Sequence, residues 1–368
     1  MVKKSLRHSL IAITFVLVSS LVVSPIPALE SPNRTIASSG TITYLSTNWY
    51  GVDFYRLVPE SPPYDQSPLF YYHLLDLIKS FNKVNCIRIH TYANVPWGYF
   101  DSNYPYTKTW LQQACGEARA KDIKTLLSCF ANEFAETDGA GKASIILNIN
   151  GAGDRWVANY AQIIRECQPD AVEIMNEPPS KGDSGNPNLT FQAYRDFVVK
   201  CCTAFRAAKP DVSLFVMDCP YWDMKDSDGT GSWATKPLTE FSDVTYSVHL
   251  YYDTSTLAYF QWAKEYQAGN LTDAKVLLYN YILNDLGLKP LIDMGMQICW
   301  TELGAEVGAS LPNWDAYLKD IYAFVTQYNQ GLVQFALSPN PPEPYGILTA
   351  DWTQLNALGL VWKAAAPS

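Results

Sequence analysis

Paired cysteine motifs are missing from this sequence of 368 residues, and so are basic clusters beyond its first eight residues. Its 27 Lys and Arg residues are scattered and are outnumbered by 36 Asp and Glu residues, which gives a net charge of −9. A nucleic-acid-binding protein needs a basic face for phosphate contacts, so nucleic acid is not an expected partner. No two cysteines have the CxxC spacing of a zinc site, and we expect neither a metal nor a cofactor.

Linkers, low-complexity tracts and repeats with periods of 20–50 residues are also missing after the first 40 residues. The chain is 48% hydrophobic, which is enough for one large core. α/β barrels of about 250 residues or more form single domains. We therefore expect one domain over residues 45–368, an N-terminal extension over 29–44, and a monomer.

The first 28 residues have the features of a targeting segment. A basic start at residues 3–8 precedes an apolar, uncharged run over 10–23. This run is shorter than the roughly 20 residues that a membrane span needs. We expect residues 1–28 to be a signal peptide cleaved after Ala28, or an uncleaved anchor because Ile26 suits the cleavage site poorly. The expected location is extracellular, with no other membrane partner.

Secretion would permit disulfides, and the 8 cysteines are even in number. Four lie in or beside strand-like apolar runs, where buried thiols are expected: Cys86, Cys129, Cys219 and Cys299. Four lie in helix-like stretches and are the better candidates for pairing: Cys115, Cys167, Cys201 and Cys202.

Short β-branched runs alternate with longer amphipathic stretches along the chain. The strand-like runs are 49–54, 86–92, 124–130, 171–176, 212–218, 245–251, 297–301 and 332–337. The helix-like stretches are 68–81, 108–121, 154–167, 190–208, 272–286, 313–328 and 352–363. This alternation implies right-handed crossovers and a parallel sheet. Eight such units predict an α/β fold, a single (β/α)8 TIM barrel.

Chemistry in such a barrel lies where the strands end, because the loops after the strands build that face. Side chains alternate along a strand, so polar residues two apart at its end point into the barrel. Polar residues stand at the ends of the second, fourth, sixth and seventh runs: Arg88 and His90, Asn176 and Glu177, His249 and Tyr251, and Glu302.

Glu177 and Glu302 would face each other across the barrel mouth. Glycoside hydrolysis needs such a pair, with one carboxyl protonated for the leaving oxygen and the other ionised. A neighbouring Arg and Tyr favour ionised Glu302, whereas apolar walls and a nearby negative charge raise the pKa of Glu177. Alone, an Asn-Glu-Pro segment is often only a turn. A lone buried Arg usually binds a loop carboxylate, and a lone His is often a hydrogen-bonded residue of the core. Their joint occurrence at the strand ends favours a site.

These segments together resemble glycoside hydrolase family 5, the cellulase and mannanase family of retaining (β/α)8 enzymes. The resemblance covers most of the chain after residue 45 and is carried by NKVNCIRIH, QPDAVEIMNEP, DVTYSVHLYYD and ICWTELGA. It implies that Glu177 is the acid/base and Glu302 the nucleophile of a double displacement. It also implies that Asn176 holds the sugar 2-hydroxyl, that Arg88 and Tyr251 steady Glu302, and that His249 lies near the acid/base. All four are candidate substrate-binding residues.

Two positions depart from the family pattern. The third strand-like run offers Ser128, Cys129 and Phe130 where the family usually has a His, and Phe335 replaces the usual sugar-stacking Trp of the eighth. Other aromatic residues are expected in or near the mouth loops, and Trp97 and Trp300 are candidate substrate contacts among Trp49, Tyr92, Trp97, Trp222 and Trp300. Alternation further places Glu173 deep in the barrel on the side of Met175 and Glu177, with Arg88 as its candidate partner.

The expected function is a secreted, retaining β-glycoside hydrolase that acts endo on β-1,4-glucan. Its partner would be a β-linked polysaccharide or oligosaccharide. Three alternatives stay open: a β-mannanase, an exo-glycosidase or transglycosylase of the same family, and a carbohydrate-binding barrel that has lost turnover. The sequence does not separate glucose from mannose or xylose as the sugar.

Overall fold

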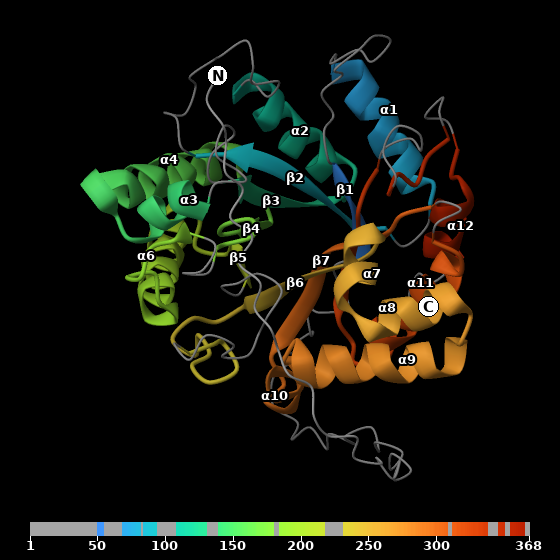
Figure 1. Ribbon diagram of the computed structural model, residues 1–368. Coiled ribbons are helices and arrows are strands. Elements are labelled where there is room, and N and C mark those ends of the chain that lie inside the picture. Colours follow the sequence, from blue (N-terminus) through green and yellow to red (C-terminus); the bar gives the residue numbers. More distant parts are fainter. Residues whose placement is uncertain are drawn as a thin grey trace, which may run out of the picture. The chain divides into compact units, whose positions relative to one another are not determined.

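Eight parallel strands close into a barrel in the order of the chain, with β1 paired to β8 (Figure 1). The strands are β1 (Tyr50–Phe54), β2 (Cys86–Tyr92), β3 (Lys124–Phe130), β4 (Ala171–Glu173), β5 (Ser213–Met217), β6 (Val244–Tyr252), β7 (Gln297–Ala305) and β8 (Gly331–Gln334). The predicted (β/α)8 barrel is confirmed, and the bounds of β2 and β3 are those expected from the sequence.

The computed structural model describes residues 50–54, 68–81, 84–93, 108–130, 139–179, 184–217, 231–307, 311–337, 345–349 and 354–364. All of them belong to one unit, Tyr44–Ser368. The leader expected over 1–28 and the extension over 29–44 lie outside the described residues and stay predictions. In the described part of the chain, no helix has both the length and the apolar character needed to cross a membrane.

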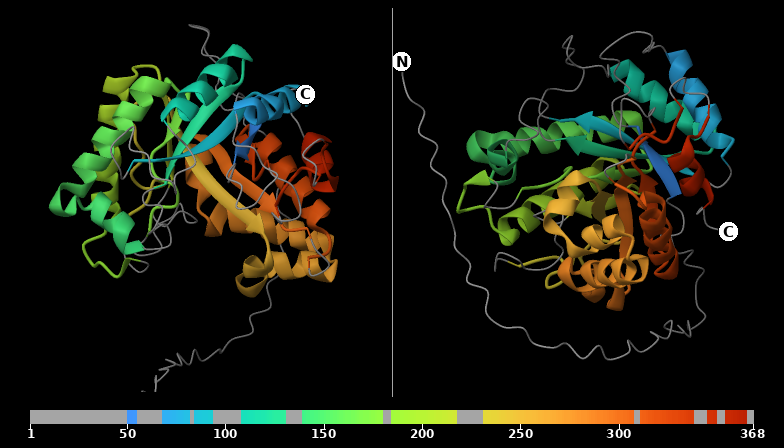
Figure 2. Two further views of the ribbon diagram at one scale, coloured as in Figure 1. Left: turned by 90° about the horizontal axis from the view of Figure 1, so that it is seen from above. Right: turned by 45° about the vertical axis from the view of Figure 1, so that its right-hand side comes forward.

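Helices surround the barrel, and two further views show them on its outer side (Figure 2). They are α1 (Pro68–Lys79), α2 (Lys108–Ala120), α3 (Gly139–Ile146), α4 (Ala152–Cys167), α6 (Phe191–Ala208), α7 (Thr254–Tyr259), α8 (Gln261–Ala268), α9 (Leu271–Asn280), α10 (Leu288–Asp293), α11 (Trp314–Gln327) and α12 (Ala357–Ala364). A 3-10 turn (Ile149–Gly151) precedes α4, and a π-helical turn (Tyr281–Asp285) follows α9.

Helix α6 illustrates how the sequence forms these elements. Thr190 caps it, because the threonine side chain accepts a hydrogen bond from the Ala193 amide at 3.2 Å. Phe191, Tyr194 and Phe197 recur at spacings of three, so they share one side of the helix, and all three are buried. The sequence missed α3, α7, α8 and α10, which are each eight residues or shorter. Such helices are too short for a periodic pattern to stand out.

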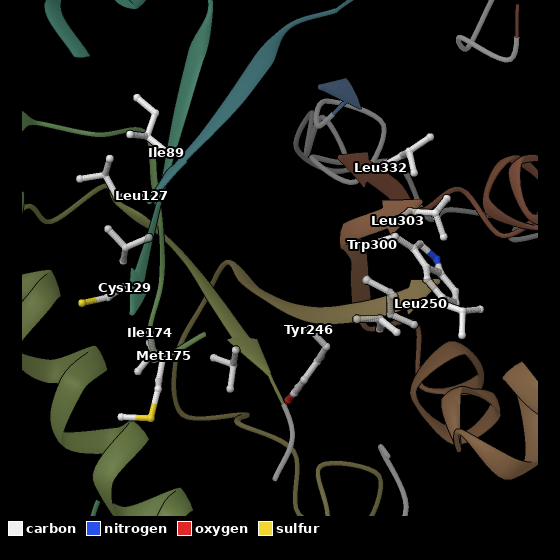
Figure 3. Packing of buried hydrophobic residues seen from close by; sticks show 14 of the residues in the cluster. Ile89, Leu127, Cys129, Ile174, Met175, Tyr246, Leu250, Trp300, Leu303 and Leu332 are labelled. Atoms are coloured by element: carbon white, nitrogen blue, oxygen red, sulfur yellow. The ribbon is translucent and has the colours of Figure 1, made fainter. Parts of the chain in front are cut away.

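Two apolar cores lie on the two sides of the strands. The outer core lies between strands and helices, and Figure 3 shows part of it, including Ile89, Leu127 and Leu303. The inner core is a small, fully buried layer inside the barrel, formed by Cys86, Leu126, Ala171, Phe215, Cys299 and Val333. Side-chain alternation along each strand separates the two sets.

Cysteines in the described residues are all free and buried, and Cys219 lies outside that part of the chain. The pairing expected among Cys115, Cys167, Cys201 and Cys202 is therefore wrong. Each of these four packs in the outer core, where a thiol behaves as a small apolar group. Burial raises the pKa of Cys86 and Cys202 to about 12, which keeps these thiols protonated.

Candidate active site

Arg88 of β2 is at the centre of the polar residues inside the barrel and is fully buried. Its guanidinium donates to Glu302 Oε1 at 2.6 Å, to Glu173 Oε2 at 2.5 Å and to Asn176 Oδ1 at 2.7 Å. Strands β2, β4 and β7 thus meet at a single cation. The expected ion pair between Arg88 and Glu173 is confirmed.

Glu173 is a buried carboxylate whose two oxygens are both occupied by donors. Ser128 donates to Oε2 at 2.6 Å and Thr301 to Oε1 at 2.7 Å, in addition to the contacts from Arg88. Burial alone raises the pKa of Glu173, but Arg88, the charge of His249 and the Ser128 hydroxyl outweigh it and lower the pKa to about 2. Ser128, one of the three residues at the end of β3 where the family usually has a His, is therefore part of this buried network.

Glu302 of β7 is buried and held on both carboxylate oxygens. Arg88 donates to Oε1, and the Tyr251 hydroxyl donates to Oε2 at 2.5 Å. Gly304 allows Tyr251 this close approach, since a Cβ at Gly304 would lie 3.2 Å from a Tyr251 ring carbon and 3.1 Å from the Phe335 carbonyl oxygen. The two donors fix the orientation of the Glu302 carboxylate.

Glu177 follows β4 in an unusual backbone conformation. Its φ is 47°, in the left-handed region that costs a non-glycine residue about 1–2 kcal/mol. The Glu177 side chain is 30% exposed, and its Oε1 lies 3.0 Å from His249 Nδ1. Burial raises the pKa of Glu177, but the hydrogen bond and charge of His249 outweigh it and the net pKa is lowered. The raised pKa expected from the sequence is wrong, because that expectation left out His249.

His249 of β6 lies between the two carboxylates. Its Nδ1 is 3.0 Å from Glu177 Oε1 and 3.3 Å from Glu302 Oε2. Burial lowers the pKa of His249, whereas the charges of Glu302 and Glu177 raise it, and the net shift is upward. The two opposite pKa shifts favour a charged pair, with Glu177 ionised and His249 protonated.

Glu177, His249 and Glu302 each offer a ligand atom, and these atoms all lie within 4.8 Å of one another. That spacing could surround a small cation. Arg88 and a protonated His249 nevertheless already place positive charge against these carboxylates. The electrostatics favour a proton-transfer pair over a metal centre, and the expected absence of a metal stays a prediction.

Phe335 lies beside the site but presents little open surface. It is 7% exposed, and its ring meets Tyr251 edge-on with centroids 5.6 Å apart. Tyr345, which the sequence analysis missed, packs on the same Tyr251 ring at 5.0 Å and donates to Asp253 at 3.0 Å. Sugar stacking by Phe335 stays a prediction.

The placement of Trp300 at the barrel mouth is wrong. Trp300 is fully buried in the outer core, where its indole N–H donates to Gln330 and its ring packs against Phe324 of α11 (Figure 3). The pairing register of β7 shifts between Trp300 and Leu303. This bulge turns both Thr301 and Glu302 inward, so counting in twos from Glu302 gives the wrong side.

A similar break in alternation follows β4. Ile174 and Met175 both lie in the outer core, although Met175 was expected on the side of Glu173 (Figure 3). The backbone N–H of Asn176 then donates to the Cys129 carbonyl at 2.9 Å, which holds this segment beside β3. Trp97, Trp49 and Trp222 lie outside the described residues, as does the side chain of Tyr92, and their roles stay predictions.

Lys142 of α3 is a buried residue that the sequence analysis did not find. It is 4% exposed and donates to the main-chain carbonyls of Asn176 at 3.1 Å and Glu177 at 2.9 Å. The only signal in the sequence is a single Lys inside the otherwise uncharged helix GAGKASII.

No protein-family model matches the sequence, and no curated protein is significantly similar to it. Solved structures do match. They include endoglucanase Cel5A of Thermotoga maritima, with 12% identity, a TM-score of 0.59, and coverage of 87% of this chain and 97% of that one. An endocellulase of Pyrococcus horikoshii, solved with cellotetraose, has 14% identity, a TM-score of 0.60, and coverage of 87% and 92%.

A third similar structure is the cellulose synthase subunit Z of Clostridioides difficile, with 15% identity, a TM-score of 0.58, and coverage of 87% and 99%. The Thermotoga protein has also been solved with cellobiose and with mannotriose. At these identities the likeness establishes the shared (β/α)8 fold over most of the chain.

Proposed function

We propose that this protein is a retaining β-glycoside hydrolase, a distant member of glycoside hydrolase family 5 that acts endo on β-1,4-glucan. One observation carries the proposal: Glu177 and Glu302 come from different strands, yet their carboxylate oxygens approach within 4.8 Å. Retaining glycosidases hold their two carboxyl groups about 5–5.5 Å apart, whereas inverting enzymes need room for a water between them. The short separation supports attack by a carboxylate.

Glu302 is the nucleophile in this proposal, since Arg88 and Tyr251 donate to its two oxygens and orient the carboxylate. In the first step a Glu302 oxygen forms a bond to the anomeric carbon while the bond to the leaving oxygen breaks. Glu177 gives its proton to that oxygen, and a glycosyl ester of Glu302 results. Glu177 suits the acid role because its side chain is the more exposed of the two.

The proton that Glu177 donates comes from the pair it forms with His249. In the free enzyme the charged form of the pair is favoured. A bound sugar excludes water and thereby favours the neutral form, in which the Nδ1 proton of His249 lies on Glu177. In the second step Glu177 takes a proton from water, whose oxygen attacks the anomeric carbon and releases Glu302. Two inversions at that carbon give net retention.

Asn176 positions the sugar in the same scheme. Its Oδ1 accepts from Arg88, and this contact orients the amide so that Nδ2 donates to the sugar 2-hydroxyl. The arrangement makes Arg88 common to substrate binding and to the nucleophile. Hydrogen bonds to the 2-hydroxyl strengthen in the transition state, so the loss of Asn176 should lower the rate more than the affinity.

The choice of a β-1,4-glucan rests on the similar structures, two of which are described as an endoglucanase and an endocellulase. Mannan stays the second candidate, because the Thermotoga protein has also been solved with mannotriose. We also propose secretion, on the basis of the basic start and apolar run of residues 1–28. A polymeric substrate outside the cell fits that location.

A polysaccharide panel tests the proposed function. Wild-type protein should release reducing ends from soluble β-glucan, and NMR early in the reaction should detect the β-anomer first. The variant Glu302→Gln should be inactive on every substrate while its near-ultraviolet circular dichroism is unchanged. Sugar binding without cleavage by the wild type would instead support a carbohydrate-binding barrel, and equal activity of Glu302→Gln would refute the mechanism.

A further inference from the structure

Lys142 is an unusual residue to find buried beside the barrel mouth. Removing an ammonium group from water is costly unless it is paired or hydrogen-bonded. Lys142 Nζ donates to the Asn176 and Glu177 carbonyls, at 3.1 and 2.9 Å. Both acceptors are main-chain oxygens. The two contacts therefore hold the backbone of residues 176 and 177, just after β4, against α3.

The two carbonyls flank the Cα atom of Glu177. The Asn176 carbonyl belongs to the peptide plane before that atom, and the Glu177 carbonyl belongs to the plane after it. One ammonium group therefore holds the two planes whose relative rotation sets the backbone angles of Glu177. These angles include the φ of 47°, which few non-glycine residues adopt.

The backbone conformation of Glu177 in turn decides where its carboxyl lies. β4 ends at Glu173, so no strand ladder continues through Glu177. The preceding residue, Asn176, is held by two hydrogen bonds. Its backbone N–H donates to the Cys129 carbonyl, and its side-chain Oδ1 accepts from Arg88. Lys142 adds the restraint on the following peptide plane, with the Glu177 carboxyl 3.0 Å from His249.

We propose that Lys142 is a positioning residue, which holds the Glu177 backbone so that the carboxyl reaches the leaving oxygen of the substrate. This inference rests on the proposed hydrolase function, in which Glu177 is the acid. In this role Lys142 acts through the backbone of Glu177. Its positive charge is also one of the influences that lower the pKa of Glu177.

Leaving-group dependence tests this assignment. The probes are two aryl β-cellobiosides, one with the strongly acidic leaving group 2,4-dinitrophenol and one with the weakly acidic leaving group phenol. Only phenol needs a proton from Glu177, and kcat/KM reports the bond-breaking step in both cases. Lys142→Met should lower kcat/KM for the phenyl glycoside about 100-fold, and that for the dinitrophenyl glycoside less than about fivefold.

The pH profile supplies a second readout that a loss of packing alone would not move. Removing the Lys142 charge makes the proton on the Glu177 and His249 pair harder to lose. The alkaline limb of kcat/KM should therefore shift to higher pH in Lys142→Met. The matched control is Lys319→Met, which removes an exposed lysine of α11 that pairs with Asp315 and should change neither readout.

Lys142→Arg covers the case in which Lys142→Met does not fold. The arginine keeps the positive charge but places its N–H donors differently from Lys142 Nζ. It should again lower kcat/KM for the phenyl glycoside more than for the dinitrophenyl glycoside. Equal losses on both substrates, or no loss, would overturn the role of Lys142. The hydrolase function would still stand in that case if the wild-type enzyme is active and Glu302→Gln is not. A wild type inactive on both glycosides and on the polysaccharide panel would overturn both.

Discussion

Two layers of inward-facing side chains in the same barrel differ sharply in chemistry, although on four strands they are only two positions apart in the sequence. The lower layer on β2, β3, β4 and β7 is apolar and consists of Cys86, Leu126, Ala171 and Cys299. The next inward residues of these strands are polar: Arg88, Ser128, Glu173 and Thr301. Both layers are buried.

The difference shows how the barrel divides stability from chemistry. The lower layer is held by removal of apolar surface from water, which needs no particular partner. The upper layer consists of buried polar groups, each of which is costly unless its hydrogen bonds are made. A change in the lower layer should therefore affect stability alone, and a change in the upper layer should affect both stability and the site above it.

The largest expected effect comes from breaking the upper layer with Glu173→Gln. This change removes one of the two carboxylates that pair with buried Arg88, and the loss of one partner of a buried ion pair costs about 4 kcal/mol. Arg88 also holds Glu302, so kcat/KM should fall about 10- to 100-fold through misplacement. Urea unfolding and steady-state kinetics measure the two effects, and a stability within about 1 kcal/mol of wild type would contradict the account.

The pH dependence of unfolding checks the same residue in another way. The pKa of Glu173 is lowered from 4.5 to about 2, so its ionised form stabilises the folded protein. That contribution is fully present above pH 4.5 and is lost as the pH falls toward 2. Wild type should therefore lose more stability over this range than Glu173→Gln does.

Leu126→Ala breaks the lower layer at a position two residues before Ser128 on the same strand. Truncation of a fully buried leucine should cost about 3 kcal/mol, through lost burial and a cavity. Activity per folded molecule should stay within about twofold of wild type, because no hydrogen bond of the upper layer changes. A kcat/KM loss as large as that of Glu173→Gln would show that the two layers are not separate in function.

The smallest expected effect is a pH shift in His249→Gln. Glu302 and Glu177 raise the pKa of His249, so the pair of Glu177 and His249 keeps its proton to higher pH than a carboxyl alone would. Without the imidazole the proton must stay on Glu177, and the alkaline limb of kcat/KM should move to lower pH. An unchanged limb would mean that His249 does not share the proton.

The sequence was most informative where alternation is regular. Arg88 and Glu173 lie on uninterrupted parts of β2 and β4, and counting residues placed both inside the barrel. Glu177 and Glu302 were located by their motifs at strand ends. The contacts of Arg88 and Tyr251 with Glu302, and of His249 with Glu177, were implied by the family resemblance.

Local departures from regular strands defeated the same reasoning. Trp300 points outward because a bulge in β7 turns two successive residues inward, and the pairing of strands sets that bulge. Lys142 was missed because α3 is short and because its acceptors are main-chain carbonyls far away in the sequence. Phe335 and Tyr345 meet only through the packing of loops after the strands.

Trapping of the glycosyl-enzyme intermediate tests the central claim most directly. A 2-deoxy-2-fluoro-β-cellobioside with a dinitrophenyl leaving group should inactivate the wild type and leave a covalent sugar on the peptide that contains Glu302. Peptide mass spectrometry after protease digestion identifies the labelled residue, and Glu302→Gln should remain unlabelled. A label on any other residue, or hydrolysis of cellobiosides with inversion and no label, would contradict the assignment of Glu177 and Glu302.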